Sequence, residues 1–88
     1  MPHPEAAMEH SQKRGLARLL LRHPERRDEL RRKYAENAHI RELCDAYEAA
    51  CEAAEYWAKS SDLIGPNRAE EYRELATATE GDILHVLS

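Results

Sequence analysis

Apolar residues spaced three and four positions apart extend from Leu30 to Trp57 without an intervening proline or glycine. On a helix of 3.6 residues per turn this spacing gathers them on one side. The pattern predicts one long helix over about residues 24–60, which would be about 55 Å long. Asn37 is the polar exception on this seam, and such residues often fix the register of paired helices. The stripe consists of Leu30, Ile40, Leu43, Cys44, Tyr47, Ala50, Cys51, Ala54 and Trp57.

Two copies of the tripeptide His-Pro-Glu, at residues 3–5 and 23–25, mark helix starts. Proline is tolerated at the first helical position, and a glutamate in the first turn suits the helix dipole. The residue before a proline is disfavoured in helices. A short N-terminal helix is therefore expected over about Pro4–Arg22, within residues 1–22. Gly15 weakens its middle by about 1 kcal/mol relative to alanine.

The dipeptide Gly65-Pro66 separates the long helix from a shorter one. Asn67 is a favourable N-cap, and Glu70 stands where a capping-box partner would. This third helix is expected over about residues 67–87. A short loop between two helices implies an antiparallel hairpin. The predicted fold is all-α, a single domain over residues 1–88 with a helical hairpin in 23–88.

The predicted long helix extends beyond its shorter partner and would leave Leu30 uncovered. An exposed contiguous apolar surface commonly marks an interface. We therefore expect a homo-oligomer, a dimer or higher, in which hairpins assemble into a helical bundle. The residues predicted to form the core and oligomer interface are Leu30, Ile40, Leu43, Cys44, Tyr47, Cys51, Trp57, Tyr72, Leu75 and Ile83. Within this set, every residue except Leu30 and the two cysteines is predicted to be largely buried.

The charge of the chain is distributed unevenly. Its 88 residues carry a net charge of −4. Residues 1–41 hold ten basic and six acidic residues, whereas residues 42–88 hold three basic and eleven acidic ones. No apolar run reaches the roughly 18 residues of a membrane span, and no secretory segment is present. These features predict a cytoplasmic location without a transmembrane segment.

Three arginines of the basic half, Arg14, Arg18 and Arg22, share one helix face at four-residue spacing. They are candidate anion-binding residues, which could contact nucleic-acid phosphates or an anionic membrane surface. They could equally form a solvated face or contact a protein partner. Complementary charge in the second half of the chain favours pairing with acids of a neighbouring subunit.

No pattern for catalysis or metal binding is present. The chain has no nucleophile–base pair and no glycine-rich loop, and its five histidines lack metal-ligand spacing. Cys44 and Cys51 would lie about 10 Å apart on one helix, too far for a disulfide between them. They are read as small seam residues, with an inter-subunit disulfide or redox contact as the alternative. No catalytic residue, cofactor or metal is predicted.

Several short motifs follow one another in the second and third predicted helices: Pro24-Glu25, Asp28, Leu30, Glu36-Asn37-Ala38-His39-Ile40, Leu43, Asp45, Glu71, Arg73, Leu75, Asp82-Ile83-Leu84 and Leu87. In this order they resemble the YdcH-like family of small bacterial helical-hairpin proteins, a domain of unknown function. The resemblance covers about residues 23–87 and implies a helical hairpin that can oligomerise, with no assigned catalytic residues. We therefore expect a small non-catalytic structural or protein–protein interaction module; binding of nucleic acid or an anionic membrane is the alternative. Ile40 replaces the usual phenylalanine, and Gly81 the usual lysine.

Overall fold

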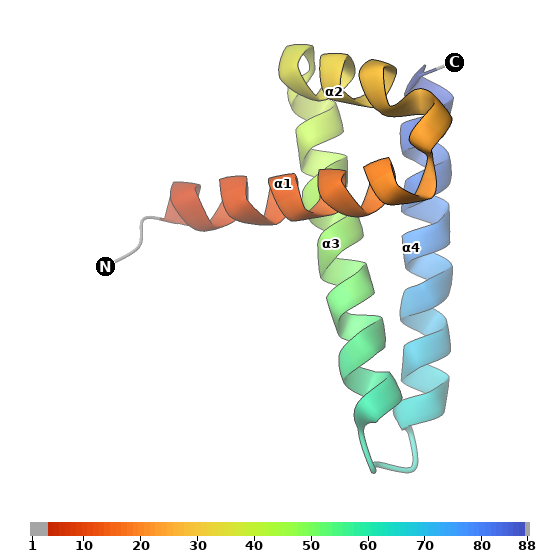
Figure 1. Ribbon diagram of the computed structural model, residues 1–88. Helices are drawn as coiled ribbons and strands as arrows, with labels where there is room; N and C mark the ends of the chain where they lie inside the picture. The colour runs from red at the N-terminus through yellow and green to blue at the C-terminus, as the bar shows by residue number, and fades with distance from the viewer. Residues whose placement is uncertain (1–3, 88) are drawn as a thin grey trace.

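The computed structural model describes residues 4–87, with side chains placed from residue 9 onward. Every regular element in this range is helical, which confirms the all-α prediction (Figure 1). The elements in chain order are α1 (Pro4–Arg22), a short 3₁₀ helix η1 (Pro24–Arg26), α2 (Arg27–Glu36), α3 (Ala38–Lys59) and α4 (Gly65–Leu87).

Helices α3 and α4 form the predicted antiparallel hairpin, and α1 and α2 run across it (Figure 1). The smallest dimension of the molecule is 18 Å. Packed helix axes lie about 8–10 Å apart, so this thickness holds two layers of helices. One face of the hairpin is therefore crossed by α1, which leaves the part nearest the α3–α4 loop open (Figure 1), and the opposite face is covered by no further layer of the described chain.

The predicted long helix is interrupted at Asn37, so one helix over residues 24–60 is wrong. Asn37 has an extended backbone (φ −127°, ψ 110°), and its side-chain oxygen accepts hydrogen bonds from the amides of His39 and Ile40. The guanidinium of Arg41 donates to the Tyr34 carbonyl at 2.7 Å, at the end of α2. Both helix ends are thus satisfied, and Asn37 acts as an N-cap rather than as a seam residue.

The turn of the hairpin also differs from the prediction. Helix α4 begins at Gly65, so Asn67 lies inside its first turn and is not the N-cap. The Asp62 carboxylate accepts the Ile64 amide at 3.3 Å, and the Asp62 carbonyl accepts the Gly65 amide at 3.0 Å. A Cβ on Gly65 would lie 2.9 Å from the Trp57 carbonyl oxygen, so the returning chain passes too close for a larger residue.

Gly15 is the point where α1 crosses α3. A Cβ at this position would overlap the backbone carbonyl of Cys44, with only 2.7 Å to the carbonyl carbon. The neighbour is main chain and cannot rotate away, so the helices approach this closely only because residue 15 has no side chain. The glycine that weakens an isolated helix is therefore required for packing.

The buried core differs in part from the predicted set. Ile40, Tyr47 and Ile83 are buried as predicted. Leu30 is fully buried in the same cluster as Leu19 and Leu87, so it is not left uncovered. The reason is that the break at Asn37 folds α2 back over the hairpin, where a straight helix would have projected beyond it. Leu43, Trp57 and Tyr72 were predicted to be buried but are only half-buried. Leu75 was also predicted to be buried but is exposed.

Candidate interaction surfaces

The three arginines predicted to bind anions hold α1 against the hairpin. Arg14 and Arg18 both reach Glu48 of α3, with Nε–carboxylate distances of 3.2 and 2.5 Å. Further along α1, Arg22 contacts Glu80 of α4 through Nε at 2.5 Å and Nη2 at 3.2 Å. The acidic partners lie in the same chain, not in a neighbouring subunit as expected. The charge asymmetry between the two halves of the sequence is thus complementary within one molecule.

Glu48 is the centre of this cluster. Its side chain is only 1% exposed. Burial is the largest single influence and disfavours the charged carboxylate. The hydrogen bonds from Arg18 and Glu52 and the positive charges of Arg18 and Arg14 together outweigh it, so the pKa of Glu48 is lowered below its ordinary value. A hydrogen bond with Glu48 raises the pKa of the neighbouring Glu52. A buried carboxylate held charged between two guanidinium groups stabilises only while those partners remain.

Glu80 is the second buried carboxylate. It accepts from Arg22, and its Oε2 lies 3.0 Å from Nε2 of His23, the residue that follows α1. Burial again disfavours the charged form, but the bonds from Arg22 and His23 outweigh it, so the pKa of Glu80 is lowered from 4.5. This site fixes the C-terminal end of α1 to α4.

The lowered pKa of Glu80 predicts a dependence of stability on pH. Because the folded-state pKa is depressed, its contribution is complete above the ordinary value of 4.5 and is lost as pH falls through the folded pKa. The Arg22→Gln variant should therefore lose less stability than the wild type between neutral pH and pH below 4.5. Urea unfolding across this range measures the difference. An equal loss in both proteins would show that the pair contributes nothing to acid sensitivity.

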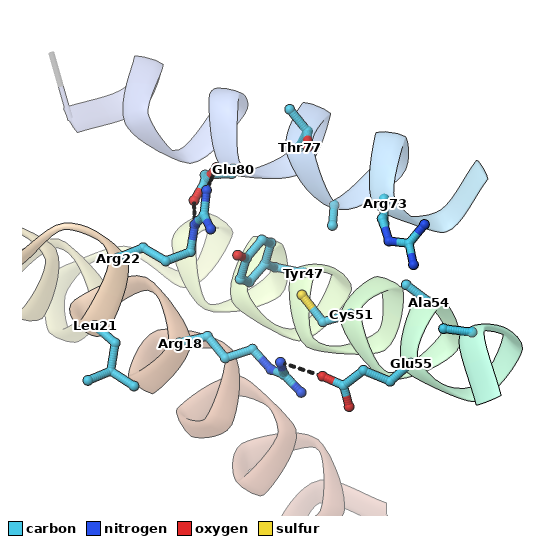
Figure 2. A pocket seen from close by; sticks show the side chains of 12 residues that line it. Arg18, Leu21, Arg22, Tyr47, Cys51, Ala54, Glu55, Arg73, Thr77 and Glu80 are labelled. Carbon is cyan, nitrogen blue, oxygen red and sulfur yellow. Dashed lines mark hydrogen bonds and ion pairs between the residues drawn. The ribbon is translucent and has the colours of Figure 1, made fainter. Parts of the chain in front are cut away.

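An open groove of about 540 Å³ lies in the corner between α1, α3 and α4 (Figure 2). Its floor contains small and apolar side chains, and its rims carry charged pairs. The Arg18–Glu55 bond, at 2.9 Å, and the Arg22–Glu80 bond lie on the α1 side. The lining residues are Arg18, Leu21, Arg22, Tyr47, Cys51, Ala54, Glu55, Ala58, Arg73, Ala76, Thr77 and Glu80.

The opposite side of the hairpin carries a stripe of apolar side chains, and we call it the outer face. Arg68 and Asp82, seven residues before and after Leu75, lie at the ends of this stripe on α4. Residues of α3 that meet α1, such as Cys44 and Glu48, lie about half a helix turn from those of the outer face. Leu75 on α4 is 52% exposed. Neighbouring side chains on this face are exposed or half-buried. The outer face consists of Ala46, Ala53 and Trp57 on α3 and Tyr72, Leu75 and Val86 on α4.

The two cysteines differ in accessibility. Cys44 is fully buried at the α1 crossing, and burial raises the pKa of its thiol to about 11. Cys51 is half-buried in the groove, and burial raises the pKa of its thiol too. Both thiols are therefore protonated at neutral pH and unreactive compared with an activated cysteine.

Sequence reasoning missed Glu48 and Glu80, although a signal for both was present. Glu48 lies four residues after Cys44 and three before Cys51, and Glu80 has the same relation to Ala76 and Ile83. Each glutamate therefore occupies a core position of an apolar stripe. An acidic residue at such a position needs a buried cationic partner, which predicts an ion pair.

Comparison with known proteins gives no relative: no protein-family model, curated protein or solved structure matches the chain. The resemblance to the YdcH-like family thus rests on the sequence motifs. Within residues 4–87, no helix is long and apolar enough to cross a membrane. In the same part of the chain, no three side chains of histidine, cysteine, aspartate or glutamate gather as a metal ion would require.

Proposed function

We propose that the chain is a non-catalytic protein–protein interaction module that self-associates through the outer face of its α3–α4 hairpin. The observation that supports this proposal is the exposure of Leu75, at 52%, on a face shared with half-buried Trp57 and Tyr72. All three were predicted to lie in the core or the oligomer interface. They are incompletely buried because α1 covers only the other side of the hairpin.

A second copy of the hairpin is the partner that suits this face best. Trp57 and Tyr72 supply large apolar area, whereas Ala46 and Ala53 allow two helices to approach closely. Aromatic residues are enriched at interface cores and charged residues are depleted there. Two hairpins related by a two-fold axis would bury the same face on both copies and make a four-helix bundle. In this arrangement α1 would lie on the outside of the dimer.

The Leu75→Glu variant should convert the dimer to a monomer. It places a charge in the centre of the apolar face, where an unpaired buried charge is costly. Because Leu75 is half-exposed in the single chain, the change should leave its folding nearly unaffected. Sedimentation equilibrium at micromolar concentration measures the mass, and circular dichroism reports helicity.

Leu21→Glu is the matched control. Leu21 is more exposed than Leu75, at 82%, but it lies on α1 beside the groove. This variant should remain a dimer. A monomeric wild type, or dissociation by Leu21→Glu but not by Leu75→Glu, would contradict self-association through the outer face.

A further inference from the structure

The groove between α1, α3 and α4 has the dimensions and lining of a small-molecule site. Its volume of about 540 Å³ lies within the roughly 300–1,000 Å³ that is usual for ligand pockets. The α3 side of its floor runs from Tyr47 to Ala58, a helix rise of about 16 Å. Cys51, Ala54, Ala58 and Ala76 give it a smooth apolar surface. An unbranched hydrocarbon chain could lie along such a surface.

The charged groups of the groove differ in where their partners lie. Three guanidinium groups and two carboxylates line it. Arg18 is bonded to Glu48 and Glu55, and Arg22 is bonded to Glu80. Arg73 is different, because the carboxylate it contacts is Glu70, at 3.4 Å and one helix turn away, outside the lining. Figure 2 shows the Arg73 side chain reaching from α4 toward α3, with no bond to the other residues drawn.

We propose that this groove binds an aliphatic carboxylate. The carboxylate lies on the guanidinium of Arg73, and the alkyl chain lies along Ala54, Ala58 and Ala76 toward Cys51. The planar guanidinium group presents two parallel donors to a carboxylate, which gives a strong and directional pair. The bound anion gives Arg73 a partner inside the groove, whereas Glu70 contacts it from outside the lining.

The lining also distinguishes this ligand from related ones. An uncharged alkyl compound would desolvate Arg73 without giving it a partner, which is costly. A cationic amphiphile would be repelled by the guanidinium of Arg73. Glu55 and Glu80 do not oppose an anion strongly, because each is already bonded to an arginine. The groove should therefore prefer an alkyl carboxylate over an alkyl alcohol or an alkylammonium ion of equal length.

Cys51 provides a direct measurement of occupancy. It lines the groove and is half-buried, whereas Cys44 is fully buried. A thiol reagent should modify Cys51 first, and peptide mass spectrometry identifies the modified residue. Dodecanoate, used below its micelle concentration, should slow modification of Cys51 in a saturable way. Dodecanol and dodecyltrimethylammonium should protect much less.

Two arginine variants test the role assigned to Arg73. Arg73→Gln should weaken dodecanoate binding by about tenfold or more, as expected for the loss of one charge-assisted pair. Arg68→Gln is the matched control, because Arg68 is also half-exposed on α4 and contacts a glutamate three residues away, but does not line the groove. This variant should bind dodecanoate like the wild type.

Several results would overturn the proposal. They are the absence of Cys51 protection by dodecanoate, equal protection by dodecanol, and equal weakening by both arginine variants. Faster modification of Cys44 would show that dodecanoate unfolds the protein instead of binding it, and would also count against the proposal. The groove and the outer face lie on opposite sides of the hairpin, so the monomeric Leu75→Glu variant should still bind dodecanoate. The two proposals can therefore fail separately.

Discussion

Replacing Gly15 with alanine should destabilise the protein by about 3 kcal/mol, the upper end of what overpacking usually costs. The added methyl group would overlap the main-chain carbonyl of Cys44, so α1 and α3 would have to separate along the crossing. A domain of this length has roughly 4–13 kcal/mol of folding free energy, so the loss is a large fraction of the total. Urea unfolding followed by circular dichroism measures it.

Gly81→Ala is the control for this change. Gly81 also lies inside a helix, but nothing approaches the position of its missing Cβ within 4 Å. Alanine there should stabilise the protein by up to about 1 kcal/mol through its higher helix propensity. The two substitutions should therefore have opposite signs. Stabilisation by both would mean that α1 does not cross α3 at residue 15.

Replacing both Arg14 and Arg18 with glutamine should cost about 3–5 kcal/mol, because it leaves the buried carboxylate of Glu48 without a cationic partner. Glutamine preserves helix propensity, so the loss would not come from α1 itself. Much of the cost reflects the desolvated charge rather than the lost attraction. Thermal and urea unfolding at neutral pH measure the change.

Adding Glu48→Met to this double variant should restore most of the stability. Methionine fills a similar volume without a charge, and buried ion pairs can often be replaced by apolar groups at little cost. An exposed pair gives the comparison: Arg68→Gln removes a surface contact with Glu71 and should change stability by less than about 1 kcal/mol. A triple variant no more stable than the double variant would exclude the buried charge as the cause.

The helices and the hairpin could be predicted from the sequence because their signals are local. The proline-glutamate starts, the three- and four-residue apolar spacing and the helix break signalled by Gly65-Pro66 each act over a few residues. The break at Asn37 was missed for a local reason as well. Asparagine suits both a polar seam position and an N-cap, and the apolar spacing continues across it.

The contacts that build the candidate surfaces could not be predicted in the same way. Arg18 meets Glu48 across 30 residues, and Arg22 meets Glu80 across 58. The four-residue spacing of the arginines shows that they share a face, but it does not show which surface that face meets. The same limit applies to Gly15, whose role depends on a crossing with Cys44. Leu75 was assigned to the core because the sequence does not show that α1 covers only one side of the hairpin.

The extended backbone at Asn37 also determines which hairpin α1 can reach. With the bend, α1 and α2 fold back onto the hairpin that follows them in the same chain. If α2 and α3 were fused into one straight helix, α1 would be carried to the far end of a rod. Its arginines and Gly15 could then meet Glu48, Glu80 and Cys44 only in a second molecule. Exchange of identical segments through a single hinge is the geometry of domain swapping. One asparagine cap thus separates a self-contained fold from an intertwined pair.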